Sequence, residues 1–359
     1  MISLCSAKFS SKHRTVSLVL WAYFLSITFI FGQTDPVPQN GVDYILERFE
    51  TYEIVAIGES HALKEQYDFL NSLLDSRGFQ MGVKNIVVEF GNSLYQPILD
   101  DYIAGKPVTD SELQKVWMNT TQSPVDPWSS SVYSEFIAHV RAINQGLDTD
   151  DQIRLIAADP PIDWSKVHDR ESYRAFSNRN AVFASIVVEE VLKKGEKALI
   201  IAGGAHLSKL FQPSPMSRTP SINLQIEETF PGSNYLIQVI TGFGKHTERI
   251  ESKMDDYPTE TIASIKDTWL GSIPAPVAIV PAGTVVEQRE VQPTLREDMY
   301  DAMLFLGKLK DLHWLSARPE IFANDSLWKE LNRRSLIRFN HELTDESRTA
   351  GEPRPKAYR

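Results

Sequence analysis

Short apolar runs alternate with longer segments of helical periodicity along most of the chain. Several runs, such as IVAI, NIVVEF and ALIIA, contain few polar residues, which is typical of strands that are covered on both faces. The predicted strands are Glu53–Ile57, Asn85–Phe90, Ile153–Ala157, Ala198–Ala202, Tyr235–Ile240, Val277–Val280 and Ala302–Leu306.

Five helices are predicted between these strands. In the first, Leu63, Tyr67, Leu70 and Leu74 share one face. Alternating strands and helices predict an α/β fold, with a mostly parallel central sheet flanked by helices in three layers. We expect one domain of this type over residues 33–343. The five helices cover residues 61–77, 94–104, 109–118, 132–146 and 172–194.

The first 32 residues have the layout of a secretory signal. Lys8, Lys12 and Arg14 precede an apolar run over residues 16–31, and Gly32 offers a small residue for cleavage. We therefore expect a secreted or periplasmic protein. If the segment is not cleaved, it becomes a signal-anchor, and residues 16–31 are then the expected membrane contact.

Composition and charge narrow the classes of partner. The chain carries 37 Lys and Arg against 47 Asp and Glu, a net charge of −10, and removal of residues 1–32 takes it to −13. Nucleic-acid binders carry clustered positive charge, so a small-molecule or peptide substrate is the expected partner. Cys5 is the only cysteine, which excludes a disulfide scaffold and a thiolate zinc site. Residues 344–359 lack apolar periodicity and are predicted to be a disordered tail.

Charged and polar side chains follow four of the predicted strands at the point where each strand ends. They are GESH at 58–61, Glu89, Asp159 and GGAH at 203–206. Ligands of an open α/β sheet bind beyond the carboxyl ends of its strands, and these ends meet at one edge. The sequence therefore predicts a site that contains two histidines and three carboxylates.

The first of these turns offers an acid/base pair. Glu59 and His61 place a carboxylate near an imidazole at a strand end, an arrangement used for proton transfer. Ser60 between them is predicted to cap the following helix. The stretch also reads G-x-S-x-A, close to a nucleophile elbow but without its last glycine. We assign Ser60 to substrate binding.

The second histidine turn repeats this logic on another strand. A glycine such as Gly204 lets the backbone approach a ligand closely, and His206 follows. His61, His206 and Glu89 could hold a divalent metal with an open position, or the histidines could move protons without a metal. Asp159 is a further candidate for substrate binding.

With these residues assembled, the chain resembles the superfamily of erythromycin-esterase-like hydrolases, haem-uptake ChaN-like proteins and Tiki-type proteases. The motif order is similar from about residue 41 to 310: GESH, strands ending in Glu89 and Asp159, a helix carrying Arg179-Asn180, and the turn with His206. The block Ser177–Ala184 resembles the family's Arg-Asp-x-x-Met-Ala segment.

The resemblance implies that His61, Glu89 and His206 are the central catalytic residues, supported by Glu59 and Arg179. Arg179 then becomes a candidate for stabilising an oxyanion. The chain departs from the esterase pattern at Ala62, where a glycine is often found. Its Gly-x-x-His form at both turns is nearer the Tiki-type pattern, which implies metal-dependent proteolysis.

Three functions are consistent with these motifs. The first is an exported hydrolase that cleaves an ester, lactone or amide with water activated by His or Glu, directly or on a metal. The second is a ChaN-like haem- or iron-binding uptake protein. The third is a non-catalytic member of the superfamily that serves as a partner surface.

Overall fold

The computed structural model describes residues 33–124, 128–210, 219–275, 294–316 and 319–350. By its internal contacts, the chain forms a unit over residues 35–359, separate from residues 1–34. The expected signal segment and the strand expected at Val277–Val280 lie outside the described residues. Within the described part, no helix is both long and apolar enough to cross a membrane.

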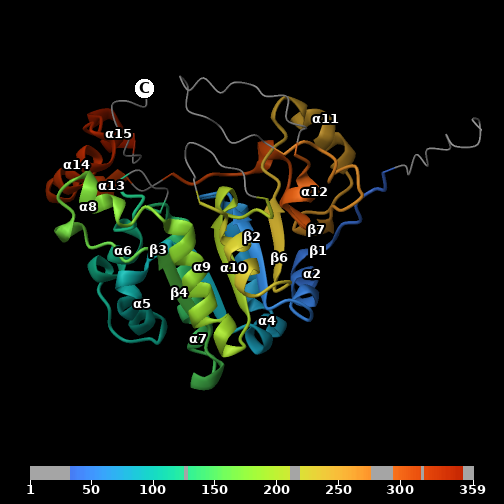
Figure 1. The fold of residues 1–359 in the computed structure, drawn as a ribbon, viewed down its shortest axis with the longest axis horizontal. Coiled ribbons are helices and arrows are strands. Elements are labelled where there is room, and N and C mark those ends of the chain that lie inside the picture. The colour runs from blue at the N-terminus through green and yellow to red at the C-terminus, as the bar shows by residue number, and fades with distance from the viewer. Residues whose placement is uncertain (1–32, 125–127, 211–218, 276–293, 317–318, 351–359) are drawn as a thin grey trace, which may run out of the picture. The chain divides into compact units, whose positions relative to one another are not determined.

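The unit over residues 35–359 is built on an eight-stranded sheet, with the order β1-β7-β8-β6-β2-β5-β3-β4 (Figure 1). The neighbours from β8 to β4 pair in parallel, whereas β7 pairs antiparallel with both β8 and β1. The predicted α/β fold with a mostly parallel sheet is therefore confirmed. The strands are β1 (Gln39–Asn40), β2 (Ile54–Glu59), β3 (Asn85–Asn92), β4 (Arg154–Asp159), β5 (Ala198–Gly203), β6 (Asn234–Val239), β7 (Thr261–Ser264) and β8 (Ala302–Phe305).

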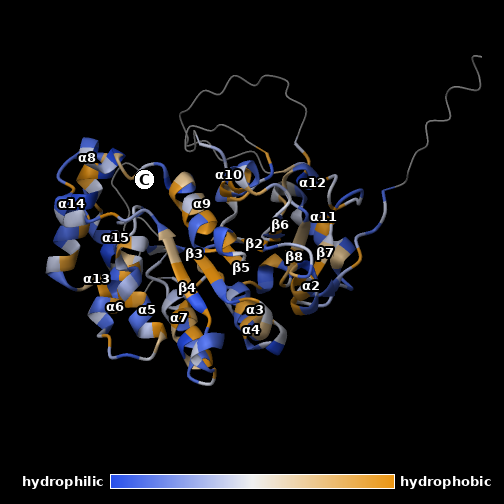
Figure 2. Cartoon of the chain, turned by 60° about the horizontal axis from the view of Figure 1, so that its bottom comes forward, coloured by the Kyte–Doolittle hydropathy of each residue, from blue (hydrophilic) through white to orange (hydrophobic). Residues whose placement is uncertain are grey.

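The central strands are apolar on both faces because helices cover both. Along β2, Val55 and Ile57 belong to one hydrophobic cluster, whereas Ile54 and Ala56 belong to the other. Figure 2 shows apolar colour along the central strands and along the helices that flank them. The first cluster includes residues of α2 (Gly41–Arg48), α3 (Lys64–Asp75), α4 (Arg77–Gly82), α5 (Gln96–Ile103), α6 (Asp110–Met118) and α7 (Ser131–Asn144). The second includes residues of α9 (Arg179–Glu190), α10 (Ile222–Thr229) and α11 (Thr247–Glu251).

The helix expected over residues 172–194 is interrupted. It splits into α8 (Arg170–Arg174) and α9. Two hydrogen bonds between residues three apart, from Phe176 N to Tyr173 O and from Ser177 N to Arg174 O, end the first helix. Asn178, with ψ of 61°, then leaves the helical region. Arg179 consequently begins a new helix instead of lying within one.

The C-terminal part differs from the expected disordered tail over 344–359. The last four α-helices of the described residues are α12 (Arg296–Met299), α13 (Pro319–Phe322), α14 (Asp325–Phe339) and α15 (Asp345–Ala350), and α15 lies within the expected tail. Arg348 of α15 donates to the carbonyls of Phe322 and Ala323, and Ser347 is buried. These tertiary contacts hold a segment without apolar periodicity, and residues 351–359 lie outside the described part.

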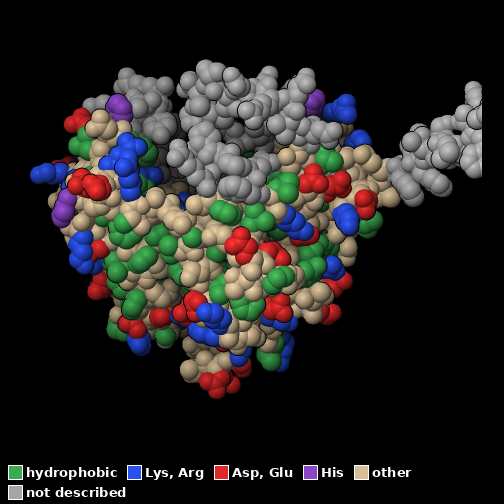
Figure 3. All heavy atoms as spheres, viewed as in Figure 1, with side chains coloured by type: hydrophobic (Ala, Val, Ile, Leu, Met, Phe, Trp, Pro, Cys, Tyr) green, Lys and Arg blue, Asp and Glu red, His purple; other side chains and the backbone are tan. Residues whose placement is uncertain are grey.

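The described surface agrees with the mixed charge of the sequence. On the face seen in Figure 3, acidic and basic side chains are interspersed with apolar ones over the described residues.

The turn after β2 contains a backbone conformation that favours glycine. Ala62 has φ of 62°, in the left-handed region. Its N–H donates to the Tyr133 hydroxyl at 2.9 Å, and its carbonyl accepts from Leu315 N at 2.9 Å. Bonds on both sides therefore hold Ala62 in a conformation that costs free energy.

This conformation predicts unequal effects of two substitutions at position 62. Ala62→Val should lower the free energy of unfolding by about 2 kcal/mol, because a β-branched side chain is poorly tolerated at positive φ. Ala62→Gly should change it by less than about 0.5 kcal/mol. Urea unfolding measures both. The matched control is Ala138→Val on exposed α7 surface, which should cost about 0.5 kcal/mol; equal effects at positions 62 and 138 would contradict the assignment.

Candidate active site

The expected convergence of polar side chains lies at the carboxyl ends of four adjacent strands, β2, β5, β3 and β4. Glu59 and Asp159 end β2 and β4, and Glu89 lies near the end of β3. His61 and His206 lie in the turns after β2 and β5. Parallel strands bring these ends to one edge of the sheet, so residues far apart in sequence become neighbours.

Glu59 is the buried centre of a hydrogen-bonded group. Its Oε1 accepts from the hydroxyls of Tyr67, at 2.8 Å, and Tyr133, at 2.9 Å. Burial, reinforced by the Glu59 charge, raises the pKa of both tyrosines well above its ordinary value, so both remain neutral donors. Oε2 of Glu59 is buried, has no hydrogen-bond partner, and lies 3.2 Å from Nδ1 of His61.

His61 has one side turned to this carboxylate and a partly exposed ring. Its side chain is 34% exposed, and its ring meets that of Trp128 edge-on at 4.6 Å between centroids. Burial alone would lower the pKa of His61, but the charge of Glu59 outweighs it, so the pKa lies above its ordinary value. Glu59 thus both orients the imidazole and stabilises its protonated form.

Glu89 is bonded through both of its oxygens. Oε1 accepts from Nη2 of Arg179 at 2.6 Å and from Nε2 of Gln122 at 2.8 Å, while Oε2 accepts from the backbone N–H of Gly203 at 2.6 Å. Burial would raise the pKa of Glu89, but the charges of His206 and Arg179 hold it well below its ordinary value. Glu89 is therefore a permanently charged anchor and a weak base.

Arg179 bridges two buried carboxylates from the first position of α9. Besides Glu89, it donates through Nε to Oδ1 of Asp159 at 3.0 Å. Asp159 also accepts from the N–H of Thr121 at 2.6 Å and from its hydroxyl at 2.7 Å. Burial raises the pKa of Asp159, against the opposing effect of Arg179. The guanidinium is thus shared between two anions.

The second histidine has a defined tautomer. Asn180 donates from Nδ2 to the carbonyl of Pro220 at 3.0 Å, which fixes the orientation of its amide. Its Oδ1 must then accept the Nδ1–H of His206, at 2.7 Å. Nε2 of His206 consequently faces the site, 3.3 Å from Nη1 of Arg179 and 3.2 Å from Oε1 of Glu89.

The glycine that brings these groups together is Gly203. A Cβ at this position would lie 2.9 Å from Cε1 of His61 and 3.1 Å from Oε2 of Glu89, so a larger residue would separate them. Gly204, which the sequence suggests for close approach to a ligand, packs instead against the amide of Gln238. Ser60, also predicted to bind substrate, has its hydroxyl bonded to Nε1 of Trp314 at 3.1 Å.

One group of side chains has the donor set for a metal. Ligand atoms of Glu59, His61 and Glu89 all lie within 4.8 Å of one another. Oε2 of Glu59 and Nδ1 of His61 lack hydrogen-bond partners, and their separation of 3.2 Å suits two ligands of one ion with bonds of about 2 Å. His206, expected as a ligand, lies outside this group and contacts Glu89.

Several residues of the site are not predictable from the sequence pattern. Periodicity assigns Tyr67 to a core stripe, and its ring does pack in the core, but its hydroxyl reaches Glu59. Tyr133 and Asn180 are similar cases of a polar tip on a buried helical residue, and Gln122 reaches Glu89 from a turn. The Arg-Asn pair at 179–180 is the local signal that points to Asn180.

Comparison with known proteins gives likeness at the level of structure. No protein-family model matches the chain, and no curated protein matches it in sequence. A structure of bacterial protein toxins is 19% identical at a TM-score of 0.38, over 56% of this chain and 37% of that one. The chain therefore spans little more than a third of the toxin chain that it matches.

Two shorter proteins match over most of their own length. One is a structural-genomics target from Bacillus cereus, 12% identical at a TM-score of 0.44, over 75% of this chain and 94% of that one. The other is ChaN of Campylobacter jejuni, described with cofacial haem, 15% identical at a TM-score of 0.35, over 56% of this chain and 86% of that one.

Proposed function

We propose that this protein is an exported hydrolase that cleaves an ester, lactone or amide bond in a small molecule or peptide. The observation that carries the proposal is the Glu59–His61 pair, in which a carboxylate held by two tyrosines faces Nδ1 of a half-exposed imidazole. A histidine oriented in this way by a buried carboxylate is the arrangement of a general base. Export is proposed from the N-terminal segment of residues 1–32.

In the proposed reaction, His61 takes a proton from water through Nε2. The water oxygen attacks the carbonyl carbon of the substrate, and Glu59 stabilises the imidazolium that forms. Of the hydrogen bonds that Arg179 makes, the one from Nη1 to Nε2 of His206 is the longest, at 3.3 Å. We therefore assign Nη1 to the stabilisation of the developing oxyanion. As the intermediate collapses, His61 returns this proton to the leaving group, directly or through Nε2 of His206, which faces the site. Both histidines therefore end the reaction neutral.

The environments of the two histidines support these separate roles. His61 faces a carboxylate with an open oxygen, which favours a proton acceptor. His206 is held through Nδ1 by the neutral amide of Asn180, and its Nε2 lies between the guanidinium of Arg179 and the carboxylate of Glu89. The ring of His206 is therefore fixed so that Nε2 is presented to the site between a cation and an anion.

A divalent cation held by Glu59, His61 and Glu89 would supply Lewis-acid activation of the water. The donor set favours the direct route, in which His61 activates the water without a metal. Both oxygens of Glu89 already accept hydrogen bonds, and Arg179 lies against one of them. Two open ligands then remain, Glu59 and His61, fewer than the three protein ligands of usual catalytic zinc sites.

Replacement of the proposed base should abolish activity without unfolding the protein. His61→Ala and Glu59→Gln should each lower kcat/KM by at least about 100-fold on a responsive member of a nitrophenyl-ester, lactone and peptide panel. The melting temperature of His61→Ala should stay within about 3 °C, because the ring is partly exposed. His139→Ala, at a histidine paired with Asp75 on the surface, is the matched control and should retain full activity. Full turnover by His61→Ala would show that the proposal is wrong.

Arg179 should affect activity and stability to different degrees in two variants. Arg179→Ala leaves Glu89 and Asp159 buried without their cation and should lower the free energy of unfolding by about 3–5 kcal/mol. Arg179→Lys keeps the charge but loses the planar fork, so its kcat/KM should fall by about 10–100-fold with a smaller loss of stability. Urea unfolding and steady-state kinetics measure the two effects. An unchanged kcat/KM in Arg179→Lys would show that Arg179 does not stabilise the oxyanion.

The direct route predicts that hydrolysis survives removal of metal. Activity of the purified protein should be unchanged after EDTA treatment and gel filtration, because the donor set leaves two open ligands. Elemental analysis before and after treatment is the accompanying measurement. The opposite result would be one equivalent of metal in the parent protein, loss of that metal in Glu59→Gln, and activity that is lost on chelation. This result would instead make His61 a metal ligand. A Soret band on haem addition that disappears in His61→Ala, with no hydrolysis on the panel, would favour the haem-binding alternative.

A further inference from the structure

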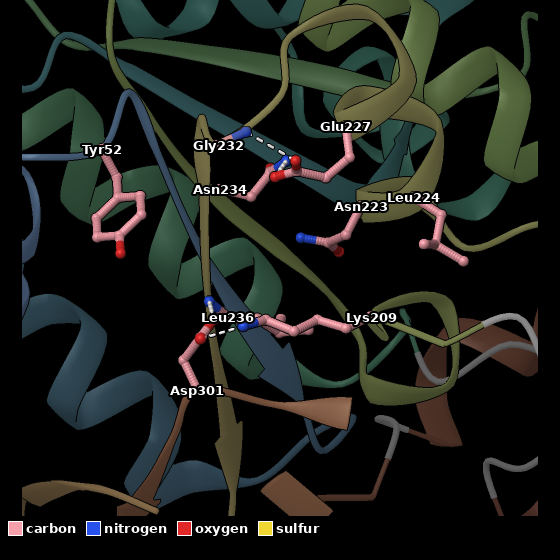
Figure 4. A pocket seen from close by; sticks show the side chains of 9 residues that line it. All are labelled: Tyr52, Lys209, Asn223, Leu224, Glu227, Gly232, Asn234, Leu236 and Asp301. Atoms are coloured by element: carbon pink, nitrogen blue, oxygen red, sulfur yellow. Dashed lines mark hydrogen bonds and ion pairs between the residues drawn. The ribbon is translucent and has the colours of Figure 1, made fainter. Parts of the chain in front are cut away.

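A second cavity lies beside β6 and the first turn of α10, and none of the residues assigned above to catalysis lines it. Its volume is about 380 Å³. Figure 4 shows its lining: Asn223 and Glu227 come from α10, Asn234 from the start of β6, and Tyr52 from the segment before β2. A cavity of this size accommodates a small organic molecule.

The cavity contains buried amide atoms that lack partners. Asn223 is only 2% exposed, and neither its Nδ2 nor its Oδ1 has a hydrogen-bond partner. In Figure 4 its amide points from α10 into the space between Tyr52 and Lys209. Asn234 is 9% exposed and donates from Nδ2 to Glu227 at 3.0 Å, while its Oδ1 has no partner. Buried polar atoms are nearly always bonded, so these three atoms indicate a ligand that bonds them.

The charged groups of the cavity already have hydrogen-bond or ion-pair partners. Lys209 is ion-paired with Asp301, which also accepts from the N–H of Leu236 at 2.9 Å. Glu227 accepts from the N–H of Gly232 at 2.7 Å and from Asn234. The open capacity is therefore uncharged: two carbonyl oxygens that accept and one amide nitrogen that donates.

We propose that this cavity is a binding site for a neutral, polyhydroxylated ligand of about monosaccharide size. A hydroxyl group donates and accepts at once, so neighbouring hydroxyls can satisfy the amides of Asn223 and Asn234 together. The aromatic ring of Tyr52 and the side chains of Leu224 and Leu236 provide apolar surface for the carbon skeleton. One lysine and two carboxylates give the lining a net negative charge, which disfavours an anion.

Calorimetric titration of the full chain with D-glucose, D-galactose, N-acetylglucosamine and glycerol tests the proposal, with phosphate, arginine and glycinamide as comparison probes. At least one of the sugars should bind saturably, with Kd of about 10 mM or tighter. Asn223→Leu should weaken this binding at least about tenfold, because it removes a donor and an acceptor. Its melting temperature without ligand should be equal to or higher than that of the parent protein, because the amide it replaces has no partner. A structural role of Asn223 would lower it.

Two control variants test whether the binding is specific to this cavity. Glu228→Ala changes an exposed residue of the same helix outside the lining and should bind the sugar normally. His61→Ala should also bind it normally, so this site stands or fails independently of the proposed hydrolase. Asn223→Ala repeats the main test with a smaller side chain.

Three results would overturn the proposal. The first is that no sugar binds with a Kd of about 10 mM or tighter, or that only a comparison probe binds. The second is unchanged sugar affinity in both Asn223 variants. The third is loss of folding in both Asn223 variants, which would show that the amide is structural.

Discussion

The arrangement of the candidate site at this edge of the sheet depends on one buried cation, Arg179. Glu89 and Asp159 lie on the neighbouring strands β3 and β4 and are almost fully buried, so their charges would be strongly unfavourable without Arg179. Through these two residues the guanidinium connects α9 to β3 and β4, and Glu89 continues the connection to β5 through Gly203 N. The break at Asn178 makes this possible, because a helix beginning at Arg179 places the side chain at the strand ends.

Features that depend on local pattern were predictable from the sequence. The parallel strands appear as apolar runs, and parallel strands necessarily bring their carboxyl ends together, so the convergence of Glu59, Glu89 and Asp159 follows from chain order. The remainder depends on partners that are distant in sequence. β7 is a strand because β8 and β1 pair with it on either side, and the Tyr133 hydroxyl reaches Glu59 only through packing of α7. Periodicity places a tyrosine ring in the core but does not reveal the partner of its hydroxyl.

The two histidines show how one sequence pattern can lead to different chemistry. Both follow a strand in a Gly-x-x-His turn, yet His61 faces a carboxylate and His206 is held by an amide. The difference arises from the residue that contacts Nδ1 of each histidine. For His61 it is Glu59, from the same turn, and for His206 it is Asn180, from α9. An imidazole beside an open carboxylate oxygen is poised to accept a proton, and one whose tautomer is fixed by a neutral group is poised to present Nε2.

Buried polar atoms without a hydrogen-bond partner occur in both regions to which a binding role is proposed. Glu89 and Glu59 are similarly buried, but Glu89 has both oxygens bonded, whereas Glu59 keeps one oxygen open toward His61. The first therefore acts as a structural anchor and the second retains capacity for chemistry. Asn223 in the second cavity is open in the same way, on uncharged atoms. Leaving such atoms unbonded opposes folding, so their occurrence at both places supports the binding role proposed for each.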